Sequence, residues 1–223
     1  MIMFERQVAK IVQALEMGSR PIGAKFSESP VGNGVDRKLR ICEALEAVRQ
    51  ENIMVNLSKE NCTCAVGRHV AGWKALSLKE LTEVFLAAKA YESEDAAKAS
   101  LDKQPQPTYR GRFLILGPLE KFESEPDTVL FIVNAAQADR ILGLASFKGA
   151  EPFMHYPTST TCSAVTYALA RKKPDINFIS VFERRRFRWS PNELIVTLPF
   201  RDFMIALRSI DASDYGKEVP SKQ

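Results

Sequence analysis

Histidine is scarce in this chain of 223 residues, which contains only His69 and His155. So few imidazoles exclude sites built on several histidines, such as a zinc centre held by three of them. Long hydrophobic runs are missing as well. No uninterrupted apolar run is longer than that at residues 129–133, whereas a membrane-spanning helix needs about 20 apolar residues. The first residues include Glu5 and Arg6, where a signal peptide would have its apolar segment, so we expect a cytoplasmic protein without a membrane span.

A large excess of one charge is missing too. The chain has 31 Lys and Arg against 27 Asp and Glu, a formal net charge of +4, which is weak for a protein that binds nucleic acid. The densest positive patch, residues 183–189, mixes arginines with Phe187 and Trp189, and we interpret it as a solvated edge strand. With 45% hydrophobic and 26% charged residues, the composition indicates an ordinary globular protein and excludes a disordered chain.

Phosphate-binding and hydrolase motifs are absent from the sequence. There is no Gly-x-Gly-x-x-Gly, no Gly-x-x-x-x-Gly-Lys-Ser/Thr and no Gly-x-Ser-x-Gly. The nearest approach lies at residues 31–35, where Gly32 and Gly34 stand without a third glycine. This segment is more typical of a turn than of a phosphate loop.

Hydrophobic periodicity predicts helices and strands that alternate along the chain. The helices are expected at residues 4–15, 39–50, 78–90, 95–102, 135–147 and 162–171, at a short segment through Val70 and Trp73, and around residues 200–207. The strands are expected at residues 21–26, 53–57, 112–116, 128–134, 176–182 and 194–198. This order predicts an α/β or α+β fold with a mixed sheet. We expect one globular unit over residues 1–210, with lobes at 1–103 and 108–210 that meet at a Pro-rich break, and a polar tail at 211–223.

The four cysteines, Cys42, Cys62, Cys64 and Cys162, are too few for a secreted disulfide scaffold, which indicates reduced thiols or metal ligands. We expect the last three to lie in first helical turns, with Asn61 as the N-cap of a helix that starts at Cys62. The positive end of a helix dipole would lower the thiol pKa and favour the reactive thiolate. Cys42 is expected within a helix, without this effect. Alternatively, each cysteine is a small apolar residue of the core.

The spacing of Cys62 and Cys64 differs from the Cys-x-x-Cys of zinc ribbons and ferredoxins. In a regular helix, residues i and i+2 point to different faces, so this pair would reach one metal ion only from a loop. Thiolate ligands favour zinc or an iron–sulfur cluster over magnesium or calcium. A third possibility is a thiol nucleophile at Cys162 that is activated by His155, whereas His69 has a poor angle toward Cys64.

Several short blocks occur together in one order along the chain. They are Pro-Ile-Gly-Ala-Lys-Phe at 21–26, Arg-Ile-Cys-Glu-Ala at 40–44, Asn-Cys-Thr-Cys at 61–64, Pro-Asp-Thr-Val-Leu-Phe at 126–131, Asn-Ala-Ala-Gln-Ala at 134–138, Cys-Ser-Ala-Val at 162–165 and Pro-Phe at 199–200. In this order the chain resembles the family of domain of unknown function 169, found largely in archaea and anaerobic bacteria. The resemblance covers about residues 21–207 and brings no established activity. It implies that Cys42, Cys162 and either Cys62 or Cys64 belong to one site.

We therefore expect a cysteine-ligated metallocentre, first of all an iron–sulfur cluster with zinc as the alternative, that acts on a small molecule in redox or Lewis-acid chemistry. Its ligands would be the four cysteines. The alternative is a metal-free small-molecule or cofactor-binding domain with structural cysteines, in which Gly32, Gly34, the helix start at Asn134 and the arginines of 184–188 would face the ligand. The residues leave open whether the protein is an enzyme, and what its oligomeric state is.

Overall fold

The computed structural model describes residues 4–102, 104, 107–149, 153–154, 161–187 and 189–217. Its centre is a sheet of eight strands in the order β2-β3-β4-β1-β5-β8-β7-β6. The strands are β1 (Ile22–Ser27), β2 (Gly34–Val35), β3 (Met54–Ser58), β4 (Phe113–Pro118), β5 (Thr128–Val133), β6 (Phe153–Met154), β7 (Asp175–Phe178) and β8 (Leu194–Pro199). The inner pairs are antiparallel, whereas the edge pairs β2–β3 and β6–β7 are parallel, so the sheet is mixed.

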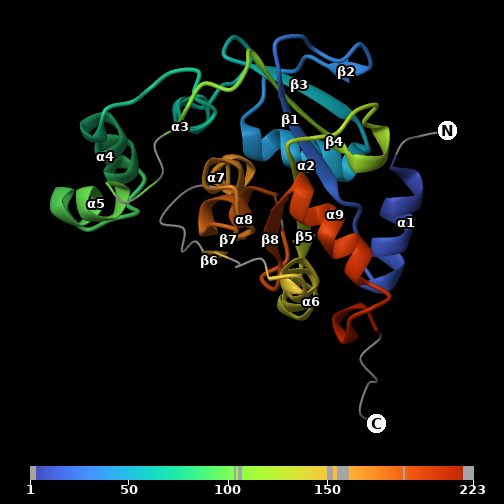
Figure 1. Cartoon of the computed structure of the whole chain (residues 1–223). Coiled ribbons are helices and arrows are strands. Elements are labelled where there is room, and N and C mark those ends of the chain that lie inside the picture. Colours follow the sequence, from blue (N-terminus) through green and yellow to red (C-terminus); the bar gives the residue numbers. More distant parts are fainter. Residues whose placement is uncertain are drawn as a thin grey trace.

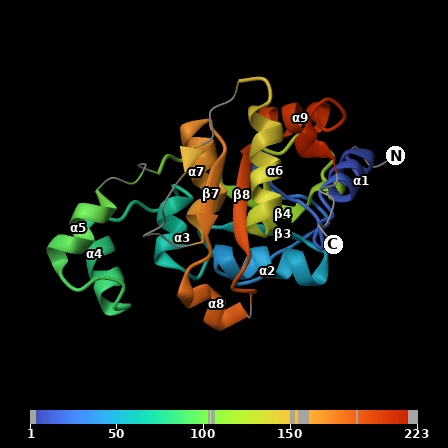
Figure 2. The ribbon, with the colours of Figure 1, turned by 90° about the horizontal axis from the view of Figure 1, so that it is seen from below.

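Helices cover both faces of this sheet (Figures 1 and 2). They are α1 (Glu5–Ala14), α2 (Ile41–Glu51), α3 (Ala65–Val70), α4 (Leu78–Ala87), α5 (Glu94–Leu101), α6 (Ala135–Ser146), α7 (Ser163–Arg171), α8 (Val181–Phe187) and α9 (Phe200–Ser209), with 3-10 turns η1 (Leu119–Lys121) and η2 (Asp214–Gly216). Of these, α4 and α5 pack against each other to one side of the sheet (Figures 1 and 2). In the part of the chain that the structure describes, no helix is long and apolar enough to cross a membrane.

The central strands are buried on both faces because their side chains alternate between two cores. In β5, Leu130 and Ile132 point into a core shared with α2, α3 and α7. Val129, Phe131 and Val133 point into a second core shared with α1, α6 and α9. The result is a helix–sheet–helix arrangement, which confirms the α/β class with helices interleaved among the strands.

Strands from both sides of the segment at 104–107 belong to this one sheet. β1, from the first half of the sequence, pairs with β4 and with β5 from the second half. The division into lobes at this segment stays a prediction.

The expected edge strand at residues 183–189 is wrong, because α8 occupies most of it and the preceding strand β7 already ends at Phe178. The helix follows a Ser-x-x-Glu signal: the Ser180 hydroxyl donates to the Glu183 carboxylate, and Arg184 N donates to Ser180 O at 3.0 Å. The side chain of Arg184 donates to the carbonyls of Ile179 and Glu193, which holds the segment after the helix.

Candidate functional site

Three of the four cysteines are brought together by a short backbone contact between distant segments. Leu39 and Cys62 form an isolated parallel bridge, with Leu39 N donating to Asn61 O at 3.1 Å and Thr63 N donating to Leu39 O at 3.0 Å. This bridge places the start of α2 beside the segment that leads into α3. Cys42 lies within a helix, α2, as expected, but it is the second residue and so lies in the first turn rather than in the middle of the helix.

The expected helix start at Cys62 is also wrong, since α3 begins at Ala65 and Cys64 is its N-cap. Asn61 does not cap a helix. Its Oδ1 accepts from Ser58 N at 2.7 Å, and its Nδ2 donates to Asn56 O at 2.8 Å, which fixes the turn after β3.

Because Cys62 and Cys64 lie in an extended segment rather than a helix, their side chains point to the same side. Gly67 lies against both of them: a Cβ atom there would be 3.2 Å from Cys62 Sγ and 3.4 Å from Cys64 Cβ. Gly67 N also donates to Cys64 Sγ at 3.4 Å. The geometric objection to a shared role for the Cys-x-Cys pair is thereby removed.

Cys162 approaches from the other half of the chain, as the N-cap of α7, which confirms the helix expected there. Its thiol interacts with that of Cys42, and Cys64 acts on it electrostatically. Cys62 in turn feels both Cys42 and Cys64. The structure thus gathers four thiols from three segments, around the N-terminal ends of α2, α3 and α7.

These thiols are deeply buried. Cys42, Cys62 and Cys162 are at most 2% exposed and belong to the core on the α2–α3–α7 side of the sheet, whereas Cys64 is half-buried. The interaction with the Cys42 thiol and burial raise the pKa of Cys162 well above its usual range. Burial raises the pKa of Cys62. The lowered thiol pKa expected for these two residues is therefore wrong, because desolvation outweighs the helix dipole.

Charged side chains adjoin the thiols. Glu183 of α8 is 8% exposed and acts electrostatically on Cys162. Burial raises the pKa of the Glu183 carboxyl, and Arg186 and Arg40 partly oppose this effect. Arg68 on α3 lowers the pKa of Cys62 slightly against the effect of burial. The site therefore combines thiols and a carboxyl of raised pKa inside with guanidinium groups at its border.

Within the described ranges, no three His, Cys, Asp or Glu side chains already form a group that could hold a metal ion. The thiols lie near one another at an apolar core without forming a ready ligand set, and coordination would require them to turn toward a common centre as thiolates.

Of the two histidines, the structure shows the surroundings of His69 only. His69 is 8% exposed, its Nδ1 accepts from Leu76 N at 3.0 Å, and burial lowers its pKa. It thus has a structural role as a neutral imidazole. His155, the expected partner of Cys162 in a thiol enzyme, lies outside the described residues.

The residues expected to bind a ligand in a metal-free domain are not brought together. Asn134 caps α6, with Gln137 N donating to its Oδ1 at 2.9 Å, and so has a structural partner. Gly32 lies in the loop before β2, and Gly34 lies in β2, where a Cβ would be 2.5 Å from Asn56 Nδ2. Three strands separate β2 from β5, the strand before Asn134, which amounts to about 19 Å across the sheet.

Sequence reasoning missed three buried polar residues near Cys162. They are Glu183, Tyr167 of α7 and Asp175 of β7. Burial raises the pKa of Tyr167, with smaller contributions from Asp175 and Cys162. Burial also raises the pKa of Asp175 to about 7. For Glu183 the Ser-x-x-Glu signal was available, whereas nothing in the local sequence marks Asp175 as buried.

Comparison with known proteins places the chain among uncharacterised relatives. The model of the DUF169 family, described as uncharacterised ArCR, matches residues 10–208. The uncharacterized protein MJ0308 of Methanocaldococcus jannaschii is 23% identical over 205 residues, which cover 87% of this chain and 88% of that protein. No solved structure matches the chain significantly.

Proposed function

The chain belongs to the DUF169 family, and we propose that it holds a metal centre on the thiolates of Cys42, Cys62, Cys64 and Cys162. One observation carries this proposal. Cys42 and Cys162, far apart in the sequence, lie in the same core close enough for their thiols to interact, and the Cys62–Cys64 pair acts on them from a segment tied to the start of α2.

The donor set fits a soft metal. Thiolates favour zinc, iron and iron–sulfur clusters, and the oxygen ligands that magnesium and calcium prefer are few here. Because burial keeps Cys62 and Cys162 protonated, metal uptake releases protons, and metal affinity rises with pH. Arg40 and Arg68 stand where they would offset the negative charge of the thiolates.

An iron–sulfur cluster is the first candidate. Zinc held by four cysteines is mostly a structural support of domains whose own core is small. This chain instead has two extensive buried cores, one on each face of the sheet, and so does not depend on a metal for burial. A centre enclosed by Ile41, Val66 and Val165 would also be shielded from water.

The residues around the thiols have distinct roles in this proposal. A bound cluster would supply one-electron transfer, or a Lewis-acid position if one of the four thiols does not ligate. Gly67 leaves room for the sulfur of Cys62, and its amide donates to that of Cys64. Glu183 lies near Cys162, and burial raises the pKa of its carboxyl, which favours a proton there. A small molecule would be the substrate or ligand of such a centre.

The test compares metal uptake by cysteine variants and a volume control. The protein, Cys42→Ser, Cys162→Ser and Val165→Ala are purified without oxygen, reconstituted with iron and sulfide, and analysed for both elements. Val165 is 1% exposed, near Cys162 in the same core, so its truncation causes a comparable packing defect without loss of a thiol. We expect both serine variants to lose most bound iron and Val165→Ala to keep it.

Equal iron in the parent and in both serine variants would overturn the proposal. Iron loss in Val165→Ala to the same extent would assign the effect to folding. If the protein takes up zinc but no iron with sulfide, the thiol site stands and the iron–sulfur assignment fails.

A further inference from the structure

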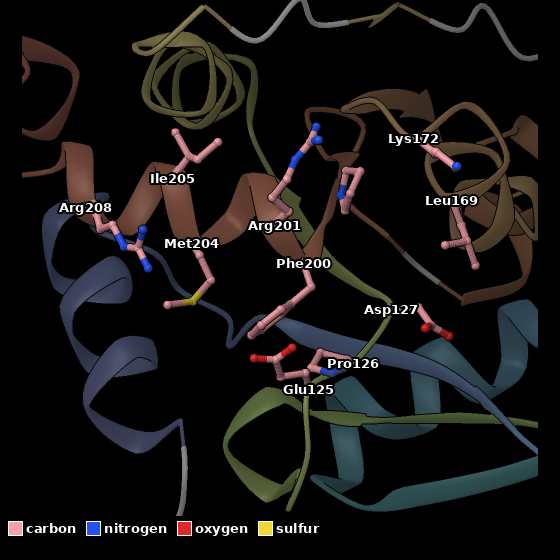
Figure 3. Close-up of a pocket in the computed structure, with 11 residues that line it drawn as sticks. Glu125, Pro126, Asp127, Leu169, Lys172, Phe200, Arg201, Met204, Ile205 and Arg208 are labelled. Carbon is pink, nitrogen blue, oxygen red and sulfur yellow. The ribbon is translucent and has the colours of Figure 1, made fainter.

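We propose a second site, a binding pocket for a small organic anion with an apolar body, where the start of α9 meets the end of α7 (Figure 3). The pocket is open to solvent and has a volume of about 560 Å³. Pockets that bind small molecules usually have 300–1,000 Å³, so the space suits a metabolite-sized ligand. It involves none of the four cysteines and does not depend on the metal centre.

The interior of the pocket is apolar. One face of α9 presents Met204 and Ile205, and Leu169 of α7 approaches from the other side (Figure 3). The ring of Phe200 points away from the helix axis toward the loop at Pro126 (Figure 3). Met204, Ile205 and Leu169 are only partly buried, so a ligand body would remove more of their apolar surface from water.

The rim is cationic at three points. Arg201 and Arg208 flank Met204 and Ile205 on the same helix face, at the spacing i, i+3, i+4, i+7. Lys172, which ends α7, faces this side of the pocket and is exposed. These three side chains alternate with apolar surface, which is the pattern an amphiphilic anion requires.

Three carboxylates lie near these cations: one has a partner elsewhere, one pairs with Arg201 itself, and one is exposed. Asp127 Oδ2 accepts from Phe26 N at 2.7 Å. Asp202 Oδ1 accepts from Arg201 Nε at 3.1 Å and is turned away from solvent. Glu125 is exposed below Phe200. The cations that remain for a ligand are thus Lys172 and Arg208, with the outer edge of Arg201.

The backbone at the start of α9 also favours an anionic group in the pocket. Pro199, the N-cap of α9, offers no side-chain cap, and Phe200 N donates to Asp127 O at 3.0 Å. The N-terminal end of the ten-residue helix α9 therefore adds its positive dipole beside Arg201, and the charge of Lys172 offsets the negative end of the α7 dipole on the same side. We place the anionic group of the ligand there and its apolar body on Phe200 and Met204.

The pocket is separate from the thiols. Cys162 and Lys172 cap opposite ends of α7, so about 15 Å of helix lies between them. A ligand in the pocket would thus not touch the proposed metal centre, and the two sites can be tested independently.

The experiment uses two-dimensional amide NMR of the folded protein with four probes. Phenyl phosphate and phenylacetate carry both an anionic group and an apolar body. Benzyl alcohol lacks the charge, and inorganic phosphate lacks the body. We expect saturable shifts of the Lys172, Arg201 and Met204 amides with the two complete probes, and binding that is at least about fivefold weaker with the two incomplete ones.

Variants link the shifts to the pocket. Lys172→Gln should weaken binding of phenyl phosphate about threefold, the usual worth of an exposed charge, and Met204→Glu should abolish it. The exposed Lys148 lies outside the pocket, so Lys148→Gln should bind as the parent does.

Equal binding of benzyl alcohol and phenyl phosphate would overturn the anionic character of the ligand. Shifts that lie elsewhere, that do not saturate, or that persist unchanged in both Lys172→Gln and Met204→Glu would overturn the site. None of these outcomes depends on metal content, so they leave the test of the cysteines unaffected.

Discussion

The two ends of α7 place functional groups in opposite surroundings. At its N-terminal end, Cys162 is 1% exposed and its thiol is held neutral beside Cys42. At its C-terminal end, the exposed Lys172 borders an open pocket with further charges on its rim. Burial suppresses ionisation at the first end, where we propose that a metal replaces the protons, whereas solvent keeps the groups at the second end charged, where we propose a diffusible ligand.

The largest expected effect is a difference in alkylation rate between the buried thiols and the accessible one. In metal-free protein, a small alkylating reagent should modify the half-buried Cys64 first. Cys42, Cys62 and Cys162 should react at least about 100-fold more slowly, since their modification requires local opening of the core. Peptide mass spectrometry after timed quenching measures the four rates.

Metal binding should extend this protection to Cys64, and a chelator should remove it. Modification of Cys162 as fast as Cys64 in the folded, metal-free protein would contradict the description of the N-terminal end of α7 as closed.

Asp175 lies below α7, where Tyr167 and Arg171 are its electrostatic neighbours, and it allows a test by pH. Burial raises the pKa of this carboxyl from 3.8 to about 7. Between these values the folded state holds a proton that the unfolded state has lost, so the free energy of unfolding falls as pH rises from 4 to 7. The cost is absent below the unfolded pKa and complete above the folded pKa, at no more than about 4 kcal/mol.

Asp175→Asn should remove this slope and stabilise the protein at pH 8 relative to the parent. Urea unfolding at pH 4.5 and at pH 8 measures the difference. Asp139 is exposed on α6, so Asp139→Asn should keep the slope of the parent. If the slopes of the parent and Asp175→Asn coincide, the pKa assigned to Asp175 in the folded protein is wrong.

The smallest expected effect concerns Gly67. In Gly67→Ala, the new Cβ would lie 3.2 Å from Cys62 Sγ, so the sulfur must shift by a few tenths of an ångström. Because alanine also favours the helix, we expect the free energy of unfolding to change by less than about 1 kcal/mol. Metal uptake should nevertheless weaken several-fold, which competition with a chromophoric chelator would measure. Unchanged uptake would show that Cys62 is not a ligand.

The fold class could be predicted from the sequence, because local patterns of apolar residues mark the strands and the helices that cover each face of the sheet. The β-branched run that became β5 and the periodic apolar residues of α6 predict their elements without tertiary information. The edge strands β2 and β6 have two residues each, too few for any pattern, and were not predicted. For α8, arginines next to aromatic residues favour the alternating pattern of a strand, whereas the Ser-x-x-Glu signal at Ser180 and Glu183 indicates the start of a helix.

The candidate site was only partly predictable for a different reason. Residue type and family-like spacing identify the cysteines, but the bridge between Leu39 and Cys62 is a long-range contact that no local pattern encodes. The direction of the Cys162 pKa shift depends on burial and on Cys42, both set by packing. The pocket at α9 has the same origin, since residues from distant parts of the sequence, such as Lys172 and Phe200, line it together.

The central claim is that the gathered thiols hold a metal, and the most direct measurement is an absorption spectrum of protein purified without oxygen, with iron, zinc and acid-labile sulfide determined on the same sample. We predict a broad band near about 400 nm, with iron and sulfide in similar amounts, that disappears in Cys42→Ser. A colourless, metal-free protein that still takes up no iron on reconstitution, with all four thiols titratable after unfolding, would contradict it.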